Sequence, residues 1–339
     1  MLKNTKLTLI VLILFIHNYK ILAQKENPIG LISFYNVENL FDTVDDPTIK
    51  DEEYLPEGRN KWDETRYQEK LINISKVISS IGNGPDIVGL CEIENRKVLE
   101  DLVQTPLLKN KRYQITHFDS PDFRGIDVAL IYKTGIFKPF DTKVIPFSVV
   151  GNSDYKTREM LWVKGLYNKD TLNVVVCHWP SRRGGKEDKR ILAAQSLRTI
   201  LDSVQQVNPK AKIILMGDFN DDPRNKSVKN ELRAGGKIEK LVRGDLYNTS
   251  MSTFKKGFGT ISYRGTWNLF DQIIISQSLL KQNSQSYYYI PDSFSPFGPD
   301  WMRVKVGEYA GSPKRTFSRG VYQNGFSDHF PSFILIGRK

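Results

Sequence analysis

The segment that most constrains this chain is Lys212–Pro223, an apolar run that ends in a cluster of acid and amide side chains. Ile213 to Met216 have the length and composition of a buried strand. After Gly217 the chain reads Asp-Phe-Asn-Asp-Asp, and Pro223 ends regular pairing because it lacks a backbone N–H. A buried strand that ends in a carboxylate and a carboxamide two residues apart holds polar groups rigidly. Taken alone, the segment is also consistent with an Asx-rich turn that caps a strand.

Residues 1–23 have the features of a secretory signal peptide. A basic start with Lys3 and Lys6 precedes the apolar run Leu7–Ile16, in which Thr8 is the one polar residue, and Ala23 offers a cleavable end. The run is too short to span a membrane as a stable helix, and no cysteine follows it that would indicate a lipid anchor. We therefore expect cleavage near Ala23 and an exported protein, periplasmic or extracellular, with no transmembrane segment.

Residues 24–339 are predicted to form a single domain. Their length permits two domains, but the sequence contains no linker rich in proline, glycine or serine, no break in composition and no internal repeat. The leader carries three lysines and no acid, so its removal lowers the formal net charge from +11 to +8 (11 − 3). A basic exported protein suits a polyanionic partner, such as nucleic acid, a phosphorylated small molecule or an anionic lipid surface. We expect a monomer.

The two cysteines, Cys91 and Cys177, each lie in an apolar, strand-like run. They provide neither a disulfide framework nor a zinc site, so the fold must be stabilised by its core, which a chain with 40% hydrophobic residues can supply. Each directly precedes a polar residue, Glu92 or His178. Because side chains alternate along a strand, we expect both thiols to point away from those groups, into the core or toward a helix. We expect them to be buried and free, although an oxidising compartment would permit a disulfide.

The rest of the chain predicts strands that alternate with a few helices. One helix follows Asp63, because this residue provides an N-cap and apolar residues recur every three or four positions up to Ile81. Two more helices are expected over 98–104 and 187–207. Buried strands with helices outside indicate a layered α/β fold, but periodicity does not decide between one sheet and two. The expected strands cover 30–41, 86–92, 113–117, 127–132, 172–177, 213–216, 271–275 and 333–336.

Polar side chains gather at the ends of these strands. Each has an ordinary explanation of its own, such as a solvated strand end or a turn cap. However, two of the three histidines outside the leader, His178 and His329, lie at such ends. An adjacent Asp328–His329 pair between a turn and a strand is also unusual on that explanation. The complete set is Asn36, Glu38, Glu92, His178, Asp218, Asn220, Asp271, Asp328 and His329.

This set combines hard oxygen ligands with two imidazoles and contains no thiolate and no HExxH motif, which favours Mg²⁺, Mn²⁺ or Ca²⁺ over zinc. Such groups suit the hydrolysis of a phosphate ester. The cation neutralises charge on the phosphoryl oxygens, a His–Asp pair activates water, and amides hold the other oxygens. The sequence has no P-loop, no glycine-rich dinucleotide fingerprint and no GxSxG elbow, so nucleotide-cofactor and serine-hydrolase functions have no support.

Seven motifs resemble those of the endonuclease/exonuclease/phosphatase superfamily, which has the deoxyribonuclease I-like fold. They are YNVENLFD, DIVGLCEIEN, RGIDVALIY, VCHWPSR, MGDFND, FDQIIIS and SDHFP, and they run from about Leu31 to Ile336. GDFN and SDH are only moderately specific alone, whereas seven motifs in the family's order are highly specific. The resemblance implies a four-layered α/β sandwich, in which helices flank two packed, mainly antiparallel β-sheets. The site would lie at one edge of the sandwich.

The resemblance also implies which residues hold a metal ion. Glu92 resembles the principal metal ligand, with Asn36 and Glu38 beside it. The family often has aspartate where this chain has Glu38. Asp328 would also reach the metal, which the resemblance implies to be Mg²⁺ or Mn²⁺, with Ca²⁺ as a further option. Asn36 would contact the substrate as well.

Catalytic roles follow from the same resemblance. Asp218 resembles the carboxylate that orients or deprotonates the attacking water, and Asn220 resembles the amide that holds the phosphate. His329 resembles the histidine that contacts the scissile phosphate, with Asp271 as its orienting partner. His178 occupies a position at which some members have a histidine that acts on the leaving oxygen and others have a tyrosine.

Two basic features have alternative explanations. Arg182 would clamp a phosphate through its planar fork, or would simply be a solvated arginine near a turn. Residues 284–326, between the last two motifs, are rich in aromatic and basic residues. They would form either an aromatic-packed cover over a sheet edge or a substrate-selecting rim on which Lys314 and Arg315 follow phosphates.

These inferences predict a secreted, divalent-metal-dependent phosphoesterase. Hydrolysis of phosphodiester bonds in nucleic acid leads, because of the positive charge. The first alternative is a phosphatase or phosphodiesterase that acts on small-molecule, inositol or lipid-headgroup phosphates. An alternative of another class is a catalytically silent binding module, which the intact set of site residues argues against.

Overall fold

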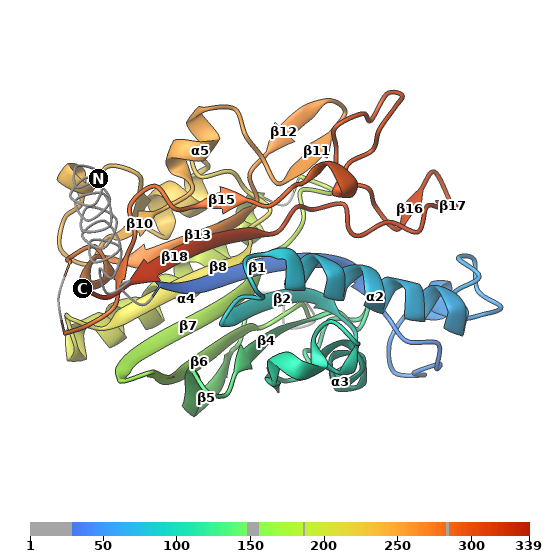
Figure 1. Ribbon diagram of the computed structural model, residues 1–339. Coiled ribbons are helices and arrows are strands. Elements are labelled where there is room, and N and C mark those ends of the chain that lie inside the picture. Colours follow the sequence, from blue (N-terminus) through green and yellow to red (C-terminus); the bar gives the residue numbers. More distant parts are fainter. Residues whose placement is uncertain (1–28, 148–155, 186, 283–284) are drawn as a thin grey trace, which may run out of the picture.

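The structure is a computed structural model that describes residues 29–147, 156–185, 187–282 and 285–339. The expected signal peptide, residues 1–23, lies outside these described residues. Within them, no helix combines the length and the apolar character needed to cross a membrane. The described part of the chain forms two seven-stranded sheets that pack face to face, with helices on their outer faces (Figure 1).

The first sheet has the strand order β14-β18-β1-β2-β4-β3, and β15 also pairs with β18. Strands β1 and β2 pair in parallel because helix α2 (Glu64–Ser80) provides the crossover between them, whereas the other described pairings are antiparallel. Asp63 is the N-cap of α2, as expected, and its side chain accepts a hydrogen bond from the Arg66 amide. The strands are β1 (Ile29–Leu40), β2 (Ile87–Ile93), β3 (Tyr113–His117), β4 (Asp127–Lys133), β14 (Tyr288–Tyr289), β15 (Ser295–Pro296) and β18 (Ser332–Gly337).

The second sheet has the strand order β5-β6-β7-β8-β13-β10-β9. Helix α4 (Glu187–Val207) connects β7 to β8, so these two strands run parallel, as do β9 and β10. The strands are β5 (Phe137–Ile145), β6 (Met160–Tyr167), β7 (Asp170–His178), β8 (Lys212–Asp218), β9 (Ala234–Gly235), β10 (Leu246–Asn248) and β13 (Asp271–Ser276). Outside the two sheets lie helices α3 (Arg96–Gln104) and α5 (Met251–Lys255) and the hairpins β11 (Ile261–Tyr263)–β12 (Thr266–Asn268) and β16 (Phe317–Ser318)–β17 (Val321–Tyr322).

Three hydrophobic cores separate four layers. The central core lies between the two sheets and includes Phe34, Leu130, Val174 and Met216. A second core packs the outer face of the first sheet against α2 and α3, which Figure 1 shows in blue and teal. A third core packs α4 against the outer face of the second sheet. The sequence prediction of a four-layered α/β sandwich is therefore confirmed, and the sheets are mainly antiparallel with parallel pairs inside them.

The structure contains two long strands, β5 and β6, that the sequence pattern did not predict. β5 lies at the edge of the second sheet, and only its terminal residues Phe137 and Ile145 are buried. Its exposed middle contains Pro139 and charged residues, which are uncommon in strands. β6 has only a short apolar run before a lysine and a glycine. Neither strand resembles a buried strand in sequence, because both depend on pairing with their neighbours.

Both cysteines are buried and free, as predicted. Cys177 faces α4, on the side of β7 opposite to His178. Cys91 lies in the core between the sheets, which is one of the two surroundings expected for it, directly beneath the polar edge. Burial raises the pKa of the Cys91 thiol well above its ordinary value, and the charges of Asp218 and Glu92 raise it further. The two thiols thus lie in different layers of the sandwich.

This separation predicts two free thiols in the purified protein. Denaturing the protein without reductant and then alkylating it should add two adducts by mass. Omitting the denaturant should give little or no modification, because both thiols are fully buried. The absence of adducts in the unfolded, unreduced sample would show instead that a disulfide joins the two cysteines.

The aromatic residues of 285–326 are mainly structural. Tyr287, Tyr289 and Phe294 lie in the core between the sheets, next to strands that pair with β18. Met302 and Phe326 are buried in the core under α2. Of the two interpretations, the cover over a sheet edge therefore explains most of the aromatic side chains.

Candidate active site

The polar strand ends meet at one edge of the sandwich. In the second sheet, Asp218 at the end of β8 is the register partner of both His178 on β7 and Asp271 on β13. In the first sheet, Asn36 on β1 donates from Nδ2 to Asp218 Oδ2 at 3.0 Å and to Glu92 Oε1 at 3.3 Å. The Asn36 amide therefore joins the two sheets at the site.

Side chains alternate between the two faces of a strand, and this alternation places the polar residues of the site on the same face as the central core. Phe34 and Met216 lie in that core, and the residues two positions further along their strands are Asn36 and Asp218. β7 follows the same pattern. The site is thus the polar end of the core between the sheets, and Asn36 and Asp218 remain only 1% and 2% exposed.

Glu92 reaches the site through an irregular backbone. Cys91 already faces the core, so regular alternation would turn Glu92 outward; a bulge and a φ of 62° at Glu92 turn it back. Its Oε2 accepts a hydrogen bond from the Asn39 backbone amide at 3.0 Å. Glu38, Asn39 and Asn220 also have positive φ. Residues with positive φ cost about 1–3 kcal/mol each and often cluster at functional sites, so four of them at this edge favour a functional site here.

His329 and Asp271 form a buried pair. His329 Nδ1 lies 2.7 Å from Asp271 Oδ2, and its Nε2 lies 3.8 Å from Asp218 Oδ2. Burial lowers the pKa of His329, but the carboxylates of Asp271 and Asp218 outweigh this effect, so the net pKa is well above its ordinary value. Asp271 therefore orients a protonated imidazole whose free nitrogen faces the centre of the site.

For Asp218 and His178, in contrast to His329, burial is the dominant effect and disfavours the charged form of each side chain. Burial raises the pKa of Asp218 to about 7, while the positive charge of His329 partly opposes that rise. Burial also lowers the pKa of His178 well below its ordinary value, and Arg158 and Arg124 lower it further. His178 is thus neutral, and its Nε2 lies 3.8 Å from both Asp218 Oδ2 and Glu92 Oε1. A proton on Nε2 would face these two carboxylates.

Asn220 holds Asp218 in place. Its backbone amide donates to Asp218 Oδ1 at 2.8 Å, and its side-chain Nδ2 donates to the Trp179 carbonyl at 2.9 Å. The side-chain amide is therefore engaged with the backbone after β7. That bond uses one of the two N–H donors of the amide, and the phosphate contact expected from the sequence stays a prediction.

Arg182 is engaged within the protein. Its Nε donates to the Asn220 carbonyl at 3.0 Å, and its other nitrogens bind Asp222 and neighbouring asparagine side chains. The guanidinium also lies 4.5 Å from the centre of the Phe270 ring. In this arrangement Arg182 braces the loop after β8, and the phosphate clamp remains a prediction.

The structure does not bring Glu38 to the group around Asp218. Its Oε1 accepts from Arg315 Nε at 2.9 Å, and its Oε2 accepts from the Thr316 amide at 2.6 Å. Burial raises the pKa of Glu38 to about 7, with the charge of Asp328 adding to the rise and that of Lys70 opposing it. Arg315 also binds Asp328 Oδ2 at 2.9 Å. Both predicted metal ligands are therefore held by one arginine.

One residue at this edge, Lys70, was missed from the sequence. Lys70 is buried in the first sheet's outer core, where it donates to Thr316 Oγ1 at 2.5 Å and to the Phe326 carbonyl at 3.0 Å. Its spacing from Tyr67 and Ile74 places it on the apolar face of α2, a signal that was available. Arg315 was singled out only as a cation of the substrate-selecting rim, and its contacts with Glu38 and Asp328 could not be predicted because Glu38 is distant in sequence.

Comparisons with known proteins agree with this geometry. The chain matches the sequence profile of the endonuclease/exonuclease/phosphatase family over residues 31–338. The chain belongs to this family. No curated protein sequence matched the chain. The family consists of hydrolases that act on phosphate esters and depend on divalent metal ions.

Solved structures share the family fold at low sequence identity. A humanised TDP2 from Danio rerio is 15% identical, with a TM-score of 0.57 and coverage of 91% of this chain and 99% of that one. The mannosyl-6-phosphatase Bt3783 of Bacteroides thetaiotaomicron is 16% identical, with a TM-score of 0.57 and the same coverage. The human Nocturnin catalytic domain is 16% identical, with a TM-score of 0.55 and coverage of 92% and 96%. These likenesses confirm the fold.

The residues at the site fit the divalent cation on which the family depends. Carboxylate oxygens of Asp218 and Asp271 lie within 4.8 Å of each other. Asn36 places its Nδ2 between the carboxylates of Glu92 and Asp218, while its Oδ1 accepts a hydrogen bond from the Glu38 backbone amide at 3.0 Å. Asp271 Oδ1 is buried without a hydrogen-bond partner. Carboxylate and amide oxygens are the donors that Mg²⁺ and Mn²⁺ prefer.

The contacts of Arg315 change what is expected from its replacement. Arg315→Ala should lower turnover of a small chromogenic phosphodiester and of a polymeric substrate alike, on the order of ten- to a hundredfold, because Glu38 and Asp328 lose their shared partner. Lys314→Ala is the matched control, because Lys314 Nζ contacts only the Asn324 carbonyl, at 3.4 Å. A raised KM confined to the polymer would instead support the substrate-selecting rim.

Proposed function

We propose that this chain is a divalent-metal-dependent phosphoesterase that hydrolyses phosphodiester bonds of nucleic acid. One observation carries the proposal: the Asp271–His329 pair and His178 both face the Asp218 carboxylate, while Asn36 links Asp218 to Glu92 across the two sheets. This arrangement places a base, two imidazoles and metal-binding oxygens around one point, as hydrolysis of a phosphate ester requires.

The protonation state of each residue decides the role that we assign to it in hydrolysis. Asp218, with its raised pKa, is suited to take the proton of the attacking water. His329, protonated and oriented by Asp271, donates from Nε2 to a non-bridging phosphate oxygen. His178, neutral, donates a hydrogen bond from Nε2 to the leaving oxygen.

Glu92 and Asn36 would hold the cation. When bound there, a divalent cation supplies positive charge that stabilises the phosphoryl and leaving oxygens. The Asp328 side chain is 26% exposed at the rim of the site and pairs with Arg315. It would complete the set of cation ligands once Arg315 releases it. Glu38 contributes indirectly, by holding Arg315 and Thr316 in place.

Positive charge around the site supports a polyanionic substrate. A hollow of about 550 Å³ beside Glu38 is lined by five basic residues, against three acids. These are Lys50, Arg59, Arg124, Arg183 and Arg315. Arg59, Arg124 and Arg315 form ion pairs with Glu53, Asp122 and Glu38, so Lys50 and Arg183 carry the charge that is unpaired among the described residues and that would attract phosphate groups. Together with the net charge of +8 expected after cleavage near Ala23, this favours nucleic acid, and the proposal keeps the enzyme exported and monomeric.

A substrate panel tests the proposal. Purified protein with Mg²⁺ would be incubated with plasmid DNA, single-stranded DNA and RNA oligonucleotides, inositol phosphates, phospholipids and a sugar phosphate. Nicking or shortening of nucleic acid at the highest kcat/KM is expected. Faster release of inorganic phosphate from a phosphomonoester would replace the nuclease by a phosphatase. Binding without turnover of any ester would identify a silent binding module.

A further inference from the structure

A second strongly basic hollow lies away from the site, at the β9 edge of the second sheet. It has a volume of about 640 Å³, between β9, the helical turns at 227–231 and 238–240, and α5. Its lining contains six cations and a single acid, Asp245. The cations are Arg224, Lys229, Arg233, Lys237, Lys240 and Lys255.

Most of this charge is uncompensated. Arg233 pairs with Asp245 at 3.0 Å, which accounts for the only acid in the lining. The other five cations form no ion pair with any residue that the structure describes. All five are exposed. Like charges that converge on one hollow repel one another, so the arrangement favours an anionic ligand that carries several charges.

The floor of the hollow is open because it contains glycine. Gly235 and Gly236 line it, and a Cβ at Gly236 would lie 2.2 Å from Met251 Cγ. Any side chain at Gly236 would therefore displace Met251 and the start of α5. Backbone at the floor and lysines at the rim allow an anionic group to enter between the charges.

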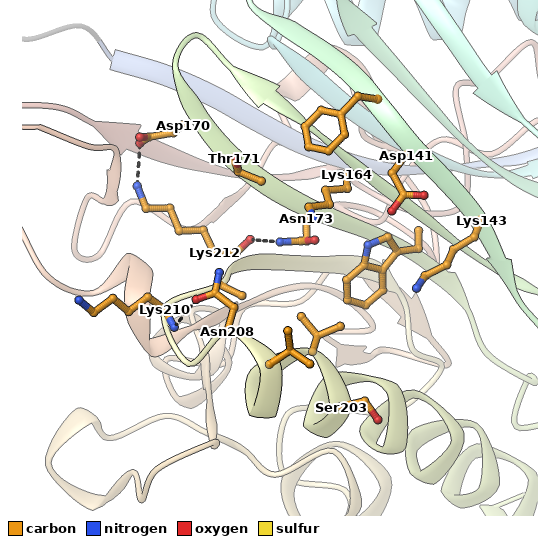
Figure 2. Close-up of a pocket in the computed structure, with 15 residues that line it drawn as sticks. Asp141, Lys143, Lys164, Asp170, Thr171, Asn173, Ser203, Asn208, Lys210 and Lys212 are labelled. Carbon is orange, nitrogen blue, oxygen red and sulfur yellow. Dashed lines mark hydrogen bonds and ion pairs between the residues drawn. The ribbon is translucent and has the colours of Figure 1, made fainter.

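A second hollow of similar volume shows that lysines in a lining do not by themselves leave unpaired positive charge. Figure 2 shows that hollow, of about 590 Å³, where Lys212 forms an ion pair with Asp170 at 2.6 Å. Lys143 lies over the Trp162 ring there, 5.2 Å from its centre. Asp170 begins β7, whereas the catalytic His178 ends it, so this hollow lies at the end of the sheet remote from the site.

One of the unpaired cations, Arg224, is within reach of a substrate bound at the site. Arg224 lies six residues after Asp218, so their Cα atoms are at most about 22 Å apart. In a nucleic acid duplex that distance corresponds to about six base pairs at 3.4 Å each. The Arg224 side chain lines the hollow and lies 5.6 Å from the centre of the Phe254 ring on α5.

We propose that this hollow binds the phosphate backbone of a nucleic acid strand several nucleotides away from the bond that is cleaved. The inference rests on the proposed function for its substrate class. The exposed cations come from separate segments around an open hollow, so they suit successive phosphates of a strand, and they provide affinity without base specificity. Short substrates would not span the site and the hollow together.

Binding measured without turnover tests this proposal separately from catalysis. A fluorescent 20-nucleotide single strand and a 4-nucleotide strand would be titrated in EDTA with wild-type protein and with Lys229→Ala/Lys237→Ala/Lys240→Ala. The matched control is Lys143→Ala/Lys164→Ala/Lys210→Ala, which removes the same charge from the hollow in Figure 2. Melting temperatures would confirm that both variants fold. Inositol hexakisphosphate would serve as a compact polyphosphate competitor.

The hollow variant should bind the 20-nucleotide strand roughly tenfold more weakly than the control at low salt. Its slope of log K against log salt should fall by about 2, since each lost phosphate contact removes about 0.7 for a single strand. The 4-nucleotide strand should bind both variants equally. Equal binding of the 20-nucleotide strand by the two variants would overturn the proposal. Loss of inositol hexakisphosphate binding alone would also overturn it, in favour of a compact polyphosphate site.

Discussion

Asp218→Asn should lower kcat by about 10²–10⁴-fold while leaving the protein folded, because it removes a positioned base and preserves the shape of the side chain. His329→Ala should cause a loss of the same order. Neither residue packs in an apolar cluster, and both lie at the polar edge where the sheets end. Rates on a chromogenic phosphodiester with Mg²⁺ would measure both losses.

Thermal stability provides a second measurement on the Asp218→Asn variant. Asp218 has a folded-state pKa of about 7, above the value of 3.8 expected in the unfolded chain, so its ionised form costs stability as the pH rises through this range. In metal-free buffer at pH 8, Asp218→Asn should therefore melt no lower than wild type. Asp119→Asn, a fully comparable change at an exposed carboxylate, is the control for both readouts. A folded Asp218→Asn protein that kept more than a few per cent of the wild-type rate would refute the role of Asp218.

Trp62→Ala should lower the free energy of unfolding by about 3–5 kcal/mol, which is the usual cost of truncating a fully buried tryptophan. Trp62 is 0% exposed, and its Nε1 donates to the Phe41 carbonyl at 3.0 Å. Its ring contacts Phe317 and Tyr322, with centres 6.1 and 6.5 Å away. Trp62 thus joins the loop after β1 to the segment that carries Arg315.

Denaturant unfolding would measure this loss as a lower midpoint at an unchanged slope. Trp62→Phe should cost less, because it retains most of the ring contacts and loses the hydrogen bond. Phe258→Ala, at a ring that is 62% exposed, should change stability by no more than about 0.5 kcal/mol. A cost below about 1 kcal/mol for Trp62→Ala would mean that the segment 285–326 is not held by this contact.

The sequence predicted those parts of the site that depend on local patterns. Asp218 and Asp271 follow or begin apolar runs, so their positions at strand ends could be predicted before the sheet order was known. Their pairing could not, because it depends on β8 lying between β7 and β13. The helix over 187–207 was predicted with its correct ends because its apolar positions recur along one face and the turn before it contains glycines.

Contacts between distant residues explain what local patterns could not predict. Glu38 lies two residues beyond Asn36 with a φ of 52°, and its carboxylate contacts Arg315, 277 residues away in sequence, while its role as a metal ligand stays a prediction. The bulge at Glu92 likewise depends on the pairing of β2 with β4, and it turns Glu92 toward the same side of the sheet as Cys91. Hydrophobic periodicity in the sequence indicates neither the positive φ of Glu38 nor the bulge at Glu92.

The most direct test of the account is metal-dependent hydrolysis at this one site. Wild-type protein and Asp218→Asn would be stripped with EDTA, and hydrolysis of bis(4-nitrophenyl) phosphate would be followed before and after addition of Mg²⁺ or Mn²⁺. We expect the wild-type rate to vanish on chelation and to return with either ion, and we expect Asp218→Asn to remain inactive throughout. Wild-type hydrolysis that survives chelation, or full activity of the variant, would contradict a metal-dependent centre built around Asp218.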